Sequence, residues 1–246
     1  MKAIILAAGR GSRLEELTAN NPKCMIQVKG KPMLGYQIDS LRKAGITEIG
    51  IVTGYLNETI QIPNVKYFHN PRWEETNMVV SLTCARDWLV KEECIVCYSD
   101  ILYPSETIEK LIAFQSEFVL PYNTDWLKVW GLRFSDPLSD AESFRINEKG
   151  LLTEIGNKAS SVEEIEGQYM GILKISTSTW SYIEEFLNSL PEIAKDKMDV
   201  TTLLKNLINR SIKIETLAIH GNWFEVDNKI DRDIYESHPE IQINFI

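Results

Sequence analysis

The sequence has few residues of the types that bind zinc or form disulfides. It contains only three histidines and four cysteines among 246 residues. The histidines show no metal-ligand spacing, which excludes the common zinc motifs. Cys94 and Cys97 have the C-x-x-C spacing of redox proteins, but they lie in an apolar run that predicts a strand, whereas a reactive pair usually begins a helix. We therefore interpret the cysteines as buried, reduced thiols.

The chain also lacks long apolar runs and an excess of basic residues. No run approaches the length of a membrane span, and residues 2–8 are too short for the apolar part of a signal peptide. We therefore expect a cytoplasmic protein without a membrane span. The formal net charge of −9 argues against nucleic acid as a partner, because a phosphate backbone requires a basic surface.

The most informative segment is the start of the chain. The apolar run 3–8 predicts a buried strand, and Gly9 and Gly11 then allow a tight turn with exposed N–H groups. Three cations lie in or just beyond this turn: Arg10, Arg13 and Lys23. Exposed amides and cations at the end of a strand form a site for a polyphosphate. This segment therefore indicates a nucleoside triphosphate and phosphoryl chemistry.

The two glycines fit the common Gly-rich motifs less well. The dinucleotide-binding fingerprint requires a third glycine at position 14, where the chain has Leu14. The P-loop requires Gly-Lys-Ser/Thr, which is missing here. A lone Gly-x-Gly is also typical of an ordinary strand-to-loop turn, but the three nearby cations favour the phosphate site.

Hydrophobic periodicity predicts an α/β protein. In the first half we expect strands at residues 3–8, 48–53, 65–69 and 94–99, with helices at 34–43 and 76–90, the latter capped by Thr76 or Asn77. In the second half we expect strands at 117–121, 165–176, 212–219 and 223–227, with helices at 180–187 and 200–209. The β-α-β order implies a mostly parallel sheet with helices on both faces, and ligands bind beyond the carboxyl ends of such strands.

Two aspartates follow predicted strands of this sheet. Asp100 ends the strand at 94–99, and Asp227 ends the strand at 223–227. Each aspartate alone is typical of helix capping or turn formation. Downstream of a polyphosphate loop, however, the pair provides the oxygen ligands that Mg²⁺ prefers.

Several motifs together resemble the nucleotidyltransferase family. They are residues 6–14 (Leu-Ala-Ala-Gly-Arg-Gly-Ser-Arg-Leu), Leu17-Thr18, Pro22-Lys23, Ser99-Asp100 and Glu225-Val226-Asp227. The resemblance covers nearly the whole chain, although Glu16 stands where many sugar-nucleotide members carry proline. It implies an enzyme with the Rossmann-like, mostly parallel sheet of nucleotide-diphospho-sugar transferases. It also implies one domain over residues 1–246, roughly 1–121 binding the nucleotide and roughly 122–246 binding the acceptor and supplying the second metal ligand.

Further segments resemble the branch of this family that uses CTP and a small phosphate monoester. Glu75-Thr76-Asn77-Met78 is similar to the CTP:phosphocholine cytidylyltransferases. Residues 126–130, 136–142, 164–169 and 221–223 are similar to the CTP:phosphoglutamine cytidylyltransferases of capsule phosphoramidate pathways. The resemblance implies transfer of CMP from CTP to phosphoglutamine, with phosphocholine or a sugar 1-phosphate as alternative acceptors.

The same resemblance assigns roles around the nucleotide. Arg13 holds the β- and γ-phosphates, Lys23 bridges the α-phosphate and the attacking phosphate, and Asp100 and Asp227 bind Mg²⁺. The expected nucleotide-binding residues are Leu6, Ala7, Ala8, Gly9, Gly11, Ser12, Arg13, Lys23, Thr76, Asn77 and Ser99. A non-catalytic nucleotide-binding module is the alternative from another class, but retention of both cations and both aspartates favours catalysis.

The sequence gives weaker signals for the acceptor site than for the nucleotide site. The expected residues are Trp126, Trp130, Arg133, Glu142, Lys158, Glu166 and Tyr169. The tryptophans are typical either of an aromatic wall or of core packing, and a lone lysine such as Lys158 is as typical of a solvated surface. Asp140, Glu142 or Glu166 suits an amine, and Arg133 or Arg145 suits a carboxylate, which favours an amino-acid-like acceptor over phosphocholine.

The sequence leaves the oligomeric state open. Six tryptophans and the terminal residues 241–246 are compatible with the surface of a homo-oligomer or with a tail docked on its own chain.

Overall fold

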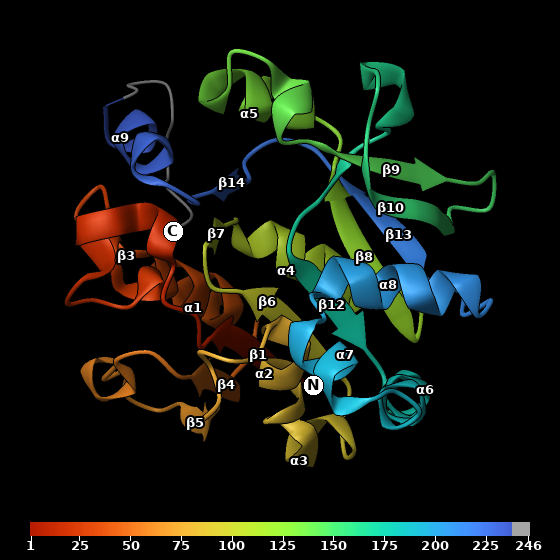
Figure 1. The fold of residues 1–246 in the computed structure, drawn as a ribbon, viewed down its shortest axis with the longest axis horizontal. Helices are drawn as coiled ribbons and strands as arrows, with labels where there is room; N and C mark the ends of the chain where they lie inside the picture. The colour runs from red at the N-terminus through yellow and green to blue at the C-terminus, as the bar shows by residue number, and fades with distance from the viewer. Residues whose placement is uncertain (238–246) are drawn as a thin grey trace.

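A computed structural model describes residues 1–237, so the terminal residues 241–246 and His238 lie outside the described part. Its central layer is a mixed sheet crossing the molecule (Figure 1). The strands of this sheet are β1 (Lys2–Ala7), β4 (Ile49–Thr53), β5 (Lys66–His69), β6 (Cys94–Tyr98), β8 (Phe118–Asn123), β11 (Gln168–Tyr169), β12 (Ile172–Ile175) and β13 (Glu215–Ile219). Their order is β11-β8-β12-β6-β1-β4-β5, and β13 pairs with β8.

The sheet is mostly parallel, as the β-α-β pattern predicts. β1 pairs in parallel with β4 and β6, β4 pairs in parallel with β5, and β8 pairs in parallel with β13. β12 and β11 run antiparallel to their neighbours. Leu6 stands beside Val52 and Tyr98 in the register, so β1, β4 and β6 end together at one edge of the sheet.

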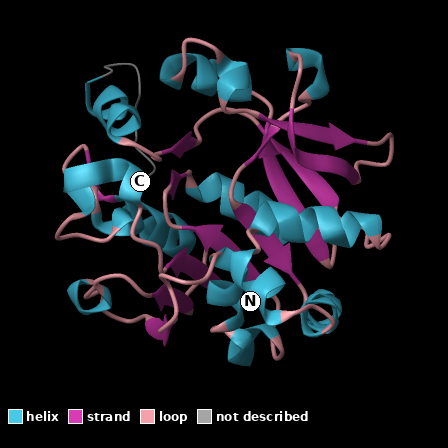
Figure 2. Ribbon diagram, viewed as in Figure 1, coloured by secondary structure: helices cyan, strands magenta, loops and turns pink. Residues whose placement is uncertain are grey.

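Helices cover both faces of the sheet (Figure 2). They are α1 (Met33–Lys43), α2 (Met78–Thr83), α3 (Arg86–Leu89), α4 (Ser105–Ala113), α5 (Trp126–Arg133), α6 (Thr177–Asn188), α7 (Glu192–Lys197), α8 (Val200–Asn209) and α9 (Lys229–Ser237). Ile4 and Leu6 pack with α2, α3, α6 and α8, whereas Ile5 and Ala7 pack with α1, α4 and α5. Successive side chains of a strand point to opposite faces, so a strand covered on both sides is apolar throughout.

Three small antiparallel pairs complete the fold. They are β2 (Gln27–Val28) with β3 (Lys31–Pro32), β7 (Ile101–Leu102) with β14 (Phe224–Glu225), and β9 (Glu142–Ile146) with β10 (Leu152–Lys158). The second pair matters most for the site, because it joins the segment after β6 to the end of the described chain. The Val226 N–H also donates to the Asp100 carbonyl at 2.9 Å, which brings the two predicted aspartates together.

The structure differs from the expected elements in several places. The expected helix at 76–90 is divided into α2 and α3, and the expected strand at 165–176 is divided into β11 and β12. Gly171 causes the second break: its φ is 71°, and a Cβ there would lie 2.9 Å from the Tyr98 ring. Glycine alone combines this backbone conformation with so close an approach. Several elements have no counterpart among the expected ones: the helices α4, α5, α7 and α9, the short strands β2, β3 and β7, and the β9–β10 pair.

Two expectations about composition can be compared with the fold. The four cysteines are free, and Cys24, Cys94 and Cys97 are buried as expected, whereas Cys84 is only half-buried. Burial raises the pKa of both Cys94 and Cys97 to about 12, so neither carries the thiolate that a reactive pair requires. Within residues 1–237 no helix is both long enough and apolar enough to cross a bilayer.

A glycine in β4 provides a test of the packing between the sheet and α3. A Cβ at Gly50 would lie 2.7 Å from the Phe68 ring and 2.9 Å from the Trp88 ring. We predict that Gly50→Ala lowers the free energy of unfolding by about 1–3 kcal/mol, because the two rings must move apart. Urea denaturation measures this change.

Gly131 in α5 is the matched control. Its Cβ would meet no atom within 4 Å, so Gly131→Ala should raise the free energy of unfolding by about 0.5–1 kcal/mol through helix propensity. Equal stability of the two variants would contradict this account of the packing.

Candidate active site

The loop that follows β1 forms one wall of the candidate active site. Gly9, Arg10, Ser12 and Arg13 are exposed in it, whereas the preceding Ala8 is buried. Gly11 has a φ of 71°, and a Cβ there would lie 2.7 Å from the Cβ of Lys23. The aliphatic part of Lys23 therefore packs directly on the glycine, which lets the loop and the lysine form one surface.

The ammonium of Lys23 lies between the two predicted aspartates. Its Nζ is 2.6 Å from Asp100 Oδ2 and 2.8 Å from Asp227 Oδ1. Burial lowers the pKa of Lys23, but the charges and hydrogen bonds of the two carboxylates outweigh it and hold the pKa above its ordinary value. Arg13 approaches from the exposed side, with Nη1 3.5 Å from Asp227 Oδ2. The structure thus brings together all four residues expected to carry the chemistry.

Glu225 is a third carboxylate at this point, and no metal role was expected for it from the sequence. Oxygen atoms of Asp100, Glu225 and Asp227 lie within 4.8 Å of one another. Burial, with the charge of Asp227 nearby, raises the pKa of Glu225 well above its ordinary range. Its position two residues before Asp227 is a signal that could have identified it, because alternate residues of a strand share a face.

These three carboxylates fit a hard divalent cation. Oδ1 of Asp100 is buried and has no hydrogen-bond partner among residues 1–237, although buried carboxylate oxygens are normally paired. Mg²⁺ prefers oxygen ligands and is typically held by one or two carboxylates together with substrate phosphates. A cation bound here would compete with the Lys23 ammonium for the oxygens of Asp100 and Asp227.

Arg133 lies behind the carboxylates, and the expectation that it binds the acceptor needs correction. Its side chain is 0% exposed. Nη1 lies 3.0 Å from Glu225 Oε2, Nη2 lies 3.5 Å from Asp227 Oδ2, and the guanidinium binds Asp231 on α9 with two hydrogen bonds of 2.9 and 3.0 Å. Asp231 in turn accepts from the Asp227 N–H at 2.9 Å. A guanidinium committed to three carboxylates supports the site from inside and is closed to the acceptor.

A cavity of about 320 Å³ includes the carboxylates in its lining, with Arg13, Asp100, Glu225 and Asp227. The rest of the lining is acidic and partly aromatic, and it includes Trp130, Asp140, Glu142, Tyr169, Asp199 and Thr201. Trp130 Nε1 donates to Asp140 Oδ2 at 3.1 Å, which fixes both side chains. The acidic residues suit a ligand with a positively charged group.

The structure separates the expected acceptor residues into two sets. Trp130, Glu142 and Tyr169 line the cavity. Trp126, Lys158 and Glu166 do not line the cavity. Trp126 packs in the core at 4% exposure, Glu166 accepts a hydrogen bond from the Ile146 N–H at 2.6 Å, and Lys158 is exposed. Asp199 and Thr201 were missed, although an Asp directly before the apolar run 200–209 is a recognisable N-cap.

The expected nucleotide-binding residues of the next segment lie at the start of α2. Asn77 is the N-cap, with Oδ1 accepting from the Met78 N–H at 2.7 Å. Thr76 accepts from Asn70 and donates to the Arg72 carbonyl, so its hydroxyl is already paired. Met78, the first residue of the helix, lines the cavity.

The support from Arg133 can be tested by stability. Replacing one partner of a buried ion pair leaves the other charges uncompensated, so Arg133→Met should cost about 3–5 kcal/mol of unfolding free energy. The exposed Arg145 lies 3.6 Å from Glu154, and Arg145→Met should change stability by less than about 0.5 kcal/mol. Thermal and urea unfolding measure both, and a small cost for Arg133→Met would show that the carboxylates do not depend on it.

Comparisons with known proteins show the family of this chain. The family model for the MobA-like NTP transferase domain matches residues 3–132. A CTP:phosphoglutamine cytidylyltransferase from Campylobacter jejuni subsp. jejuni is 38% identical, covering 95% of this chain and 98% of that protein. A choline-phosphate cytidylyltransferase from Streptococcus pneumoniae is 36% identical over 55% of this chain and 60% of that protein.

A solved structure also has the same fold. The structure of a CTP:phosphocholine cytidylyltransferase from Streptococcus pneumoniae covers 96% of this chain and 97% of its own, with a TM-score of 0.72 and 22% identity. The expected Rossmann-like, mostly parallel α/β fold is thereby confirmed.

Proposed function

The chain belongs to the family of MobA-like NTP transferase domains, and from that premise we propose that it transfers CMP from CTP to phosphoglutamine. Membership makes it a nucleotidyltransferase. The observation that carries the proposal is the arrangement of Lys23 between Asp100 and Asp227 beside the loop 9–11. A phosphate-binding loop, a cation and paired carboxylates are the parts that phosphoryl transfer requires.

In the proposed reaction an oxygen of the acceptor phosphate attacks the α-phosphorus of CTP. A new phosphorus–oxygen bond forms as the bond to pyrophosphate breaks, and a phosphate dianion needs no general base for this step. Lys23 offsets the repulsion between the two phosphates, and Arg13 stabilises the departing pyrophosphate. We propose Mg²⁺ as the cation held by Asp100, Glu225 and Asp227, where it supplies charge neutralisation at the α-phosphate.

Two features bear on the acceptor. The carboxylates of Asp140, Glu142 and Asp199 in the cavity lining suit the amine of phosphoglutamine. They also suit the quaternary ammonium of phosphocholine, beside which Tyr169 is an aromatic residue of the lining. The Trp130 ring is less suited to that role, because it stacks on Trp223 and has the Arg133 guanidinium 5.1 Å from its centroid. The expected argument from Arg133 and Arg145 no longer separates the two acceptors, because Arg133 is buried and Arg145 pairs with Glu154 outside the cavity lining. The 38% identity to the phosphoglutamine enzyme over almost the whole chain makes phosphoglutamine the first choice.

Substrate choice is tested by pyrophosphate release with Mg²⁺. We expect release with CTP, and not with ATP, GTP or UTP, when phosphoglutamine is the acceptor. Phosphocholine, phosphoethanolamine, 2-aminoethylphosphonate and glucose 1-phosphate complete the panel. Pyrophosphate release with phosphocholine alone would show that phosphocholine, and not phosphoglutamine, is the acceptor. No pyrophosphate release with any acceptor, in a protein that still binds CTP, would favour a non-catalytic nucleotide-binding module.

A substitution of Lys23 distinguishes an enzyme from a nucleotide-binding module. We predict that Lys23→Ala lowers kcat by at least about 100-fold while CTP still binds, because the charge is needed mainly in the transition state. The exposed Lys43→Ala is the control and should leave kcat within twofold. Unchanged turnover in Lys23→Ala would contradict the proposed mechanism.

The metal site has its own readout. Asp227→Asn and Glu225→Gln should weaken Mn²⁺ binding, measured by electron paramagnetic resonance without nucleotide, by at least about tenfold each, because each removes a charged oxygen ligand. Undiminished Mn²⁺ binding in both would exclude these carboxylates as ligands. A role in surface polysaccharide modification, a cytoplasmic location and self-association as a homo-oligomer remain predictions.

A further inference from the structure

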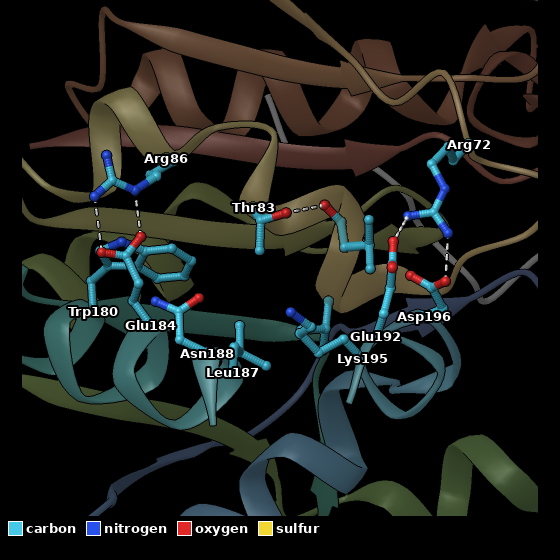
Figure 3. A pocket seen from close by; sticks show the side chains of 12 residues that line it. Arg72, Thr83, Arg86, Trp180, Glu184, Leu187, Asn188, Glu192, Lys195 and Asp196 are labelled. Atoms are coloured by element: carbon cyan, nitrogen blue, oxygen red, sulfur yellow. Dashed lines mark hydrogen bonds and ion pairs between the residues drawn. The ribbon is translucent and has the colours of Figure 1, made fainter. Parts of the chain in front are cut away.

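A second cavity, of about 490 Å³, lies between the α2–α3 segment and the α6–α7 segment (Figure 3). Ion pairs cross it at its two ends. At one end Arg86 on α3 binds Glu184 on α6 with two hydrogen bonds, and at the other end Arg72 binds Glu192 and Asp196 of α7. The two arginines thus connect the same pair of layers at opposite ends.

Arg72 is the more extensively bound of the two. It lies in the loop before α2, with Nη1 3.2 Å from Glu192 Oε1 and Nε 3.5 Å from Glu75 Oε2, and Nη2 binds Asp196. The Asp196 side chain is only 14% exposed, whereas Glu75 and Glu192 are open to solvent. A guanidinium shared by three carboxylates makes a network, and networks contribute more than isolated surface pairs.

The residues that follow Asp196 pass from the second cavity to the candidate active site. Asp196 lines the second cavity, and Asp199 and Thr201 line the active-site cavity. The start of α2 divides the cavities in the same way, because Met78 faces the active site and Val79 faces the second cavity. One thin wall therefore separates the two spaces.

Backbone hydrogen bonds hold that wall together. The Asn77 N–H donates to the Asp196 carbonyl at 2.7 Å, and the Val79 N–H donates to the Met198 carbonyl at 3.4 Å. Asn77 Nδ2 adds a bond of 3.3 Å to the Lys197 carbonyl. Asp196 thus accepts two hydrogen bonds from the first half of the chain: its carbonyl accepts from Asn77, and its carboxylate accepts from Arg72.

We propose that Arg72 is a positioning residue for the acceptor. Through Asp196 it fixes the segment 196–201, and so sets where Asp199 and Thr201 stand in the active-site cavity. Neither Arg72 nor the loop 9–11 lines that cavity. Thr76 and Asn77, which are expected to bind the nucleotide, are held by the carbonyls of Arg72 and Asp196, and a change of the Arg72 side chain leaves those carbonyls in place. Loss of the Arg72 side chain should therefore weaken acceptor binding and spare CTP binding. The inference rests on the proposed function, because it assigns the acidic part of the cavity lining to the acceptor.

Arg86 provides a matched control within the same cavity. It is the same residue type, pairs with a carboxylate across the same gap and is likewise exposed. Its partner helix α6, however, contributes no residue to the active-site cavity. A general loosening of the two layers would affect both arginine variants alike, whereas positioning of the acceptor would affect Arg72 alone.

The kinetic test uses charge reversal in the full chain. Arg72→Glu sets four acidic groups against one another and should raise the KM for the acceptor about tenfold, with kcat and the KM for CTP within twofold. Arg86→Glu should leave all three constants within twofold, and Arg72→Lys should restore most of the acceptor affinity. Equal increases in both KM values, or the same change in Arg86→Glu, would overturn the proposal.

Hydrogen–deuterium exchange measures the segment without any reaction. Amides of residues 196–203 should exchange about fivefold faster in Arg72→Glu than in the wild type, and at the wild-type rate in Arg86→Glu. Unchanged exchange in Arg72→Glu would overturn the positioning role even if turnover follows the proposed function. Lack of turnover by the wild type with every acceptor would overturn the proposed function itself, and the exchange rates would still report whether Arg72 fixes the segment.

Discussion

The whole site depends on holding three carboxylates close together at the edge of a buried sheet. Like charges within a few ångströms repel, and burial makes each of them more costly. Two cations offset this repulsion: Lys23, whose side chain packs on Gly11, and Arg133, which approaches from the interior. The Lys23 side chain is 12% exposed, whereas Arg133 is fully enclosed and bound to Asp231, so Arg133 belongs to the scaffold and Lys23 is the cation proposed for the chemistry. Three distant parts of the chain therefore meet at the carboxylates: the segment of Lys23, the helix α5 through Arg133, and the helix α9 through Asp231.

The nucleotide side could be predicted from sequence because its signals are local. An apolar run, two glycines and nearby cations fall within one stretch, and the rule that parallel strands end at a common edge places Asp100 beside them. The role of Glu225 and the burial of Arg133 could not be predicted in this way. Both depend on the pairing of β14 with β7 and on the docking of α9, which are long-range contacts made by two-residue strands and by a mostly polar helix.

The residues expected to bind the acceptor were predicted only in part, because residues close together in the sequence have different surroundings in the fold. Trp126 and Trp130 lie one helical turn apart on α5 and both are buried in the core at 4% exposure, yet only Trp130 also lines the cavity, where it binds Asp140. Glu166 has the right charge but is committed to a backbone amide of β9. Asp199 is the N-cap of α8, which is distant in sequence from the other cavity residues, and it also lines the cavity. The sequence identifies such a residue as a helix cap, but only the fold shows that it also borders a cavity.

The β7–β14 pair has a consequence for the order in which the protein assembles. It joins residues 101–102 to residues 224–225, so two of the three carboxylates reach the third only through a contact between distant parts of the chain. Closing a contact of such high sequence separation is entropically costly, and contacts of this kind slow folding. A nascent chain that already contains the loop 9–11, Lys23 and Asp100 still lacks the carboxylates of Glu225 and Asp227 and the support of α9. The cluster of three carboxylates is therefore complete only when the last elements of the chain have been made and have docked.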